Sequence, residues 1–186
     1  MMLYASLYHP PDVLDAHEAF GANCGPCTLA AVLRRPVMAV QRLFPSFAER
    51  GYVNPSQMRV ALQSAGQLSG VQHRVCSTDE RERGLLDYGV ACIFFTGPWS
   101  KPGVPIGAAY QRSHWIGVAM TRDEHRCYYD VNAWIDQERR GAWVSWAHWD
   151  KEILPQLVAS YSQADGGYSI RWAAEVMLPH ESGTPS

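Results

Sequence analysis

The stretch that decides the fold of this chain runs from Gly21 to Ala30 and reads Gly-Ala-Asn-Cys-Gly-Pro-Cys-Thr-Leu-Ala. Pro26 suits the first turn of a helix, because an N–H group there has no intrahelical acceptor. The apolar run that follows and the closing Arg-Arg-Pro at 34–36 predict a helix over residues 24–35. Cys24 is therefore expected at a helix N-terminus, where backbone N–H groups and the helix dipole favour a thiolate.

Two chemistries fit this stretch. The sequence Cys-Gly-Pro-Cys resembles the active sequence of thioredoxins, in which two thiols close a disulfide. That interpretation needs a buried strand before Cys24, but residues 15–22 are polar or small and predict no strand. The other interpretation makes Cys24 a nucleophile, with a histidine as its acid and base and a third polar side chain to orient that histidine. We favour the second interpretation and expect Cys27 to be a packed core thiol.

A suitable histidine stands at the start of an apolar run. Residues 113–120 read Ser-His-Trp-Ile-Gly-Val-Ala-Met, so His114 begins a predicted strand and can reach a cleft while the strand lies in the core. A polar connector at 121–125 predicts a hairpin to the next strand. On that strand Asp130 and Asn132 share one face, because side chains alternate. Either could hold the His114 ring and fix its tautomer.

These motifs, in this order along residues 15–135, resemble the papain-like cysteine peptidase superfamily. They are most similar to the bacteriocin-leader-processing branch and its phage and bacterial relatives. The resemblance implies Cys24 as nucleophile, His114 as general base and acid, and Asp130 as orienting residue, with Asn132 as the alternative. It implies an α+β fold in which the cysteine helix packs on an antiparallel β-sheet. It also implies a thiol hydrolase of peptides or other amides that needs no metal and no organic cofactor.

One position departs from that superfamily. Its members usually carry a glutamine six residues before the cysteine, which donates to the oxyanion, and here that position is Glu18. An ionised carboxylate cannot donate, so the backbone N–H of Cys24, with Asn23 or His17, is expected to take over. The departure leaves open a papain-like binding or assembly module without catalysis. Deamidation or cross-linking of glutamine at the same site also stays open.

The rest of the chain predicts helices first and strands second, joined by short turns, which favours an α+β protein with an antiparallel sheet. We expect one domain over residues 1–178, a disordered tail over 179–186, a loosely held arm over the first twelve residues and a solvated surface at the charged run 79–83. The expected helices are 37–49, 54–65 with Gly66 as its stop, and one after Trp149; the expected strands are 71–76, 90–95, 114–120, 126–131 and 168–178.

Composition narrows the function classes. The 186 residues carry a net charge of −2, and 47% are hydrophobic, which predicts a folded core and no basic field for nucleic acid. No apolar run approaches the ~20 residues of a membrane helix. Five scattered cysteines favour free thiols in a reducing compartment, and the N-terminus does not resemble a signal peptide. We therefore expect a cytoplasmic protein, of a bacterium or a phage-infected cell, whose partner is a peptide or protein substrate.

Overall fold

The computed structural model describes residues 7–179 except 85, 106–108, 110, 122, 124, 137 and 138. Within these residues, six strands form one sheet in the order β1-β6-β2-β3-β4-β5, and each neighbouring pair is antiparallel. The expected α+β architecture with an antiparallel sheet is thus confirmed. The strands are β1 (Gln72–Val75), β2 (Tyr88–Phe95), β3 (Ser113–Met120), β4 (Arg126–Trp134), β5 (Arg140–Ser145) and β6 (Tyr168–Met177).

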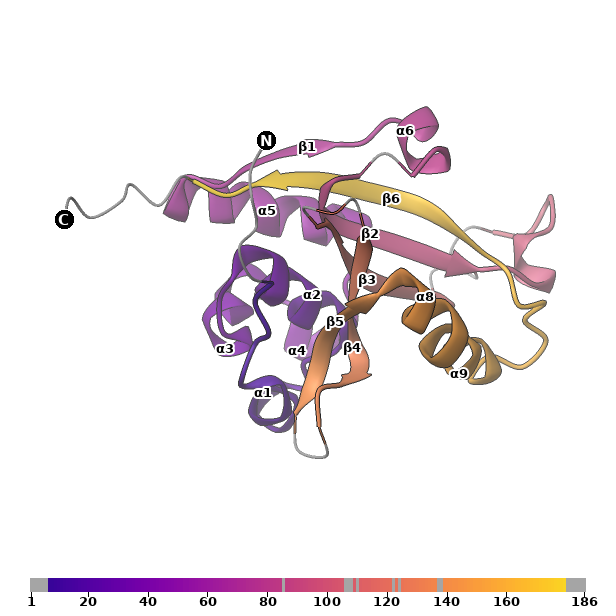
Figure 1. The fold of residues 1–186 in the computed structure, drawn as a ribbon, viewed down its shortest axis with the longest axis horizontal. Helices are drawn as coiled ribbons and strands as arrows, with labels where there is room; N and C mark the ends of the chain where they lie inside the picture. Colours follow the sequence, from indigo (N-terminus) through magenta and orange to yellow (C-terminus); the bar gives the residue numbers. More distant parts are fainter. Residues whose placement is uncertain are drawn as a thin grey trace.

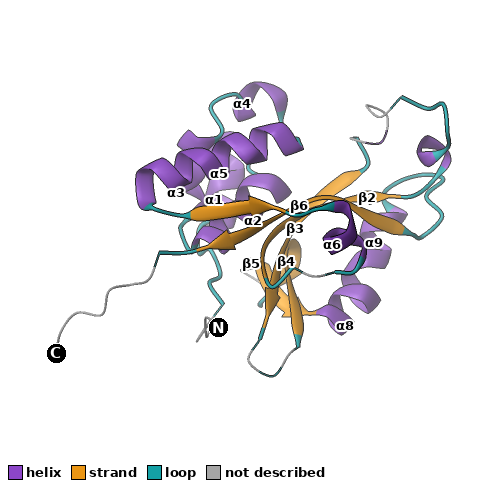
Figure 2. Cartoon of the chain, turned by 90° about the horizontal axis from the view of Figure 1, so that it is seen from above, coloured by secondary structure: helices purple, strands orange, loops and turns teal. Residues whose placement is uncertain are grey.

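Helices cover both faces of this sheet (Figures 1 and 2). The N-terminal group is α1 (Val13–Phe20), α2 (Cys24–Leu33), α3 (Val37–Val40), η1 (Gln41–Leu43), α4 (Phe47–Arg50) and α5 (Pro55–Ser69). The C-terminal group is α8 (Trp146–His148), the π-helical turn η3 (Trp149–Ile153) and α9 (Leu154–Ala159). Two short elements, α6 (Thr78–Glu82) and η2 (Pro98–Ser100), lie in connections. No helix in the described part of the chain is long and apolar enough to cross a bilayer.

The central strand β2 shows how the two layers meet the sheet. All of its residues are buried, and alternate side chains enter different apolar clusters. Val90, Cys92 and Phe94 pack with the N-terminal helices, whereas Ile93 and Phe95 pack with η3 and α9. The sheet is therefore buried on both faces, and the sequence analysis had expected only the layer that contains the cysteine helix.

Helix α2 is fixed against β3 by close packing and two hydrogen bonds. Every residue from Gly25 to Leu33 is buried. A Cβ on Gly25 would lie 2.6 Å from Val53 Cγ2, so only glycine permits this approach. Thr28 Oγ1 donates to the Trp115 carbonyl at 3.1 Å, and Trp115 Nε1 donates to the Val53 carbonyl at 2.7 Å. These contacts set the position of the first turn of α2 relative to the start of β3.

Several predicted helix boundaries need correction. The expected helix over 37–49 is three short elements, because Pro45 has no N–H and interrupts the chain between η1 and α4. The helix that begins after Asn54 has the expected capping box with Gln57, but it does not stop at Gly66. It continues to Ser69 and ends at Gly70, whose φ of 69° is left-handed.

Two segments have more structure than expected. Residues 78–82 of the charged run form α6, which begins with a capping box between Ser77 and Glu80. Residues 7–12 are not loose, because the Asp12 carboxylate accepts from the N–H groups of Val37 and Met38 at 2.8 and 2.9 Å. The Tyr8 carbonyl also accepts from the Trp143 indole. The tail expected to be disordered lies, after Pro179, outside the described residues.

Candidate active site

His114, near the start of β3, and Asp130, in the middle of β4, form a buried pair. His114 Nε2 lies 3.0 Å from Asp130 Oδ2. The His114 residue is 6% exposed, and Asp130 has no exposed surface. Strands β3 and β4 pair between Gly117–Met120 and Arg126–Tyr129, so His114 lies beyond the paired section. The sequence reasoning left the orienting residue open, and the structure places Asp130 against the ring.

The Asp130 carboxylate accepts three further hydrogen bonds. Its Oδ2 atom accepts from Trp149 Nε1 at 2.8 Å. Its Oδ1 atom accepts from the backbone N–H of Asn132 at 2.8 Å and from Asn132 Nδ2 at 3.1 Å. Asn132 therefore supports Asp130 instead of replacing it, and its own Oδ1 accepts from Arg140. A carboxylate can lie in the core when its lone pairs are satisfied in this way.

The protonation of the pair follows from these contacts. Burial alone would raise the pKa of Asp130, but His114 and the donors from Asn132 and Trp149 hold it below its ordinary value. Burial alone would lower the pKa of His114, yet the Asp130 charge and Cys24 raise it to about 10. His114 thus stabilises the fold fully below its ordinary pKa of 6.5, and this contribution is lost as the pH rises through about 10. At neutral pH the pair is imidazolium and carboxylate.

Cys24 opens α2 and is partly buried beside this pair. Cys24 interacts electrostatically with His114, and this interaction contributes to the raised pKa of the imidazole. Since His114 Nε2 faces Asp130, Nδ1 is the ring nitrogen left for the sulfur. Cys27, one turn further on, has no exposed surface, and burial raises the pKa of its thiol well above the ordinary value. All five cysteines are free, as expected.

A cavity of about 810 Å³ opens beside Cys24 and His114. Cys24 and His114 both line it, and Asn132 and Arg140 line the wall next to His114. The other walls come from α1, residues 51–56, the residues around the start of β3, and Leu157 and Tyr161 near α9. The nucleophile candidate and the imidazole are therefore accessible from one open space, while Asp130 is enclosed behind it.

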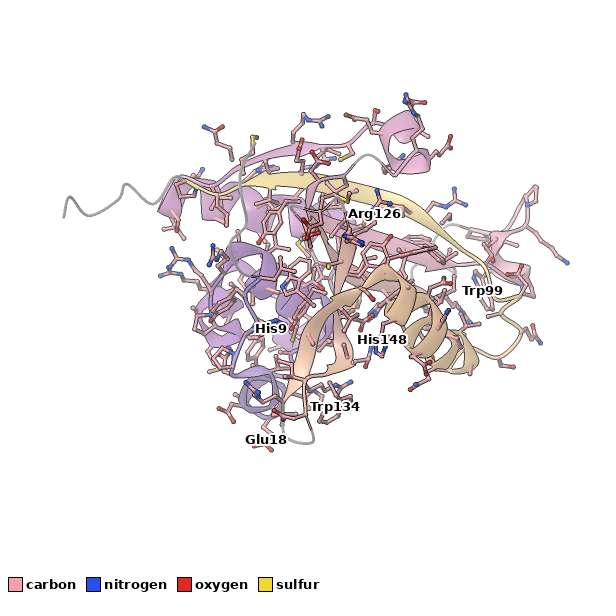
Figure 3. All side chains as sticks on the ribbon, in the orientation of Figure 1. His9, Glu18, Trp99, Arg126, Trp134 and His148 are labelled. Atoms are coloured by element: carbon pink, nitrogen blue, oxygen red, sulfur yellow. The ribbon has the colours of Figure 1, made fainter. Side chains whose placement is uncertain are left out.

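The candidate oxyanion donors differ in what they can supply. Glu18 is exposed on α1 and does not line the cavity; Figure 3 shows it at the edge of the molecule. His17 lines the cavity, but its Nδ1 already donates to the Ala22 carbonyl at 3.1 Å. Asn23 caps α2 through Oδ1 on the Gly25 N–H and uses one amide hydrogen for the Gly51 carbonyl. One N–H of Asn23 remains, together with the backbone N–H of Cys24 in the first helical turn.

Sequence reasoning missed two residues of this site. Trp149 is one of three tryptophans spaced three apart, a spacing typical of packing residues, but the three lie in β5, α8 and η3. Nothing in its local sequence links it to Asp130, nineteen residues earlier. Arg140 was not considered, and the strand it begins, β5, was not predicted. A π-helical turn such as η3 is frequent at functional sites, but no sequence pattern shows it in advance.

Comparisons with known proteins do not assign the chain to a family. No protein-family model matches the sequence, and no curated protein matches it significantly.

Asp130→Asn is expected to lower the pKa of His114 from about 10 toward its ordinary 6.5, because the amide removes the negative charge that contributes most to raising this pKa against the effect of burial. The His114 ring signals in a proton NMR titration measure this shift, and the spectrum of His114→Gln assigns them. A His114 pKa that is the same in both proteins would contradict the account of the pair.

Trp149→Phe is expected to lower the free energy of unfolding by about 1–3 kcal/mol, because a buried carboxylate loses one donor while the aromatic packing is largely kept. Chemical denaturation measures this effect. Trp146→Phe is the matched control, since Trp146 is 48% exposed, and it should change stability by about 0.5 kcal/mol or less. Equal losses in the two variants would show that Trp149 only fills space.

Proposed function

We propose that this protein is a papain-like thiol hydrolase that cleaves peptide or related amide bonds through an acyl-enzyme. The observation that carries the proposal is the position of His114, which is held by the buried Asp130 and lines the same open cavity as Cys24, whose interaction with the imidazole helps to raise the pKa of His114. A cysteine at a helix N-terminus beside an imidazolium has the surroundings of a nucleophilic thiolate.

The reaction begins with Cys24 as a thiolate beside the His114 imidazolium, and the sulfur attacks the amide carbonyl carbon. The tetrahedral intermediate collapses as the His114 imidazolium protonates the leaving nitrogen, the C–N bond breaks and the amine departs. The neutral His114 then takes a proton from water, the hydroxide attacks the thioester, and the C–S bond breaks. The acid leaves, and the Cys24 thiolate and the His114 imidazolium are restored. Asp130 stays ionised and orients the ring throughout.

The oxyanion is held by the backbone N–H of Cys24 and the remaining N–H of Asn23. Asn23 is the favoured side chain because both ends of its amide are already fixed, on Gly25 and on Gly51. One ring nitrogen of His17, Nδ1, is already bonded to the Ala22 carbonyl. Glu18 has no part in this arrangement.

The redox alternative places the chemistry on Cys24 and Cys27. The helical α1 before Cys24, the antiparallel sheet and the full burial of Cys27 favour the hydrolase instead. A module that binds a peptide without cleaving it would use the same cavity. Variants at the two cysteines separate these functions.

Cys24→Ser is expected to abolish both cleavage of a randomised fluorogenic peptide pool and labelling by a peptidyl epoxide, because the reacting sulfur is gone. Cys27→Ser should keep both activities, and mass spectrometry should locate the adduct on Cys24 in the wild type and in Cys27→Ser. Loss of activity in both variants, with reduction of insulin by the wild type, would favour the redox protein. A folded wild type that binds the pool but is neither labelled nor active would favour the binding module.

Asn23→Asp and Asn23→Ala are each expected to lower kcat for that pool by about 10²–10³, because both lose the amide donor. Asp caps a helix as well as Asn does, so only the alanine variant should also lose about 1 kcal/mol of stability. Steady-state kinetics and chemical denaturation measure the two effects. His17→Ala should retain most of its kcat, and the reverse pattern would assign the oxyanion donor to His17.

A further inference from the structure

The charges around the cavity are uneven. Arg140 is the only arginine, and no lysine, aspartate or glutamate accompanies it, among the described residues that line this space. Apart from Cys24 and two histidines, the remaining lining side chains are apolar or carry neutral polar groups. Asp130, the nearest buried carboxylate of the site, does not line the cavity. A ligand that enters therefore meets Arg140, besides the His114 imidazolium that Asp130 already neutralises, and no carboxylate on the described walls.

The Arg140 guanidinium is held in place before any ligand arrives. Arg140 begins β5 and is partly buried. Its Nε donates to the Val131 carbonyl at 2.9 Å, and one Nη2 hydrogen goes to Asn132 Oδ1. A guanidinium has five N–H groups, so two bonds fix its plane and leave others for a ligand. Among the described residues, no carboxylate forms an ion pair with Arg140.

Arg140 is also joined to the reacting groups through a short chain of contacts. It donates to Asn132, Asn132 donates to Asp130, and Asp130 holds His114. Arg140, Asn132 and His114 all line the cavity. An anion bound by Arg140 would therefore share this space with the imidazole. Fixed guanidinium groups bind carboxylates with paired, charge-assisted hydrogen bonds.

We propose that Arg140 forms an anion subsite that selects peptides with a carboxylate close to the bond attacked by Cys24. The proposal rests on the proposed function and adds the substrate class, an acidic peptide segment. Apolar walls from residues such as Leu14, Val53 and Leu157 take the neighbouring side chains. The carboxylate comes either from an Asp or Glu side chain or from the C-terminus of the peptide, and both present the same two oxygens to Arg140.

The test compares matched pools of fluorogenic peptides with the full chain. Within each pair, one pool carries Glu and the other carries Gln at the same fixed position. Separate pairs place this position before or after the cleaved bond. Each pool is made once with a free and once with an amidated C-terminus. The expected kcat/KM is about tenfold or more higher for the Glu pool, and higher salt should reduce the ratio. A ratio that depends only on the free C-terminus identifies that carboxylate as the ligand.

Arg140→Gln should bring the ratio close to one, and Arg140→Lys should keep part of it because the charge remains. Arg139→Gln is the matched control, since Arg139 is exposed, is paired with Asp136 and does not line the cavity. It should leave the ratio unchanged. If Arg140→Gln lowers kcat/KM equally for both pools, Arg140 only supports Asn132 and the subsite is overturned.

Binding separates this proposal from the proposed function. Retention of the same pools by immobilised Cys24→Ala protein, with and without Arg140→Gln, measures selection without cleavage. Preferential retention of a carboxylate pool that Arg140→Gln removes supports the subsite even if the wild type cleaves neither pool, an outcome that would overturn the hydrolase alone. Equal retention of all the pools overturns the subsite even if the wild type is an active hydrolase.

Discussion

The site depends on one buried negative charge, the Asp130 carboxylate. It has no exposed surface, and it accepts from His114, from Trp149 and twice from Asn132. A charge in the core is tolerated only when such partners replace water, and removing a partner costs about 3–5 kcal/mol when the charge is left uncompensated. The carboxylate therefore connects the start of β3, the middle of β4 and the π-helical turn η3. It also keeps His114 charged and pointed at the cysteine.

The site also requires that Cys24 lies next to the His114 ring. The packing of the N-terminal helices satisfies this requirement. Helix α2 is buried along almost its whole length and cannot shift without disturbing the core. Its first turn is set by Gly25 against Val53 and by the hydrogen bonds that join Thr28, Trp115 and Val53. The nucleophile candidate thus comes from the layer on one face of the sheet, whereas the indole that supports Asp130 comes from the layer on the other face.

The sequence predicts the parts of this arrangement that are local. The cysteine helix, the capping box at Asn54 and the hairpin that follows His114 each have a short-range signal, and the structure contains all three. Whether Asp130 or Asn132 holds the His114 ring depends on where β3 and β4 stop pairing, and no local sequence pattern predicts that point. Trp149 acts across nineteen positions through tertiary packing. Gly66 was taken as a helix stop because glycine often ends helices, but here it lets the helix pass close to the Val71 carbonyl, 2.8 Å from where a Cβ would lie.

The most direct measurement of the central claim is the rate at which iodoacetamide alkylates Cys24 at neutral pH in the wild type and in His114→Ala. The account predicts that the rate falls about tenfold or more in the variant, because the sulfur loses the imidazolium that stabilises its anion. Alkylation of the partly buried Cys127, which lies outside the cavity, should stay the same in both proteins. Equal rates at Cys24 in the two proteins would contradict a nucleophile activated by His114.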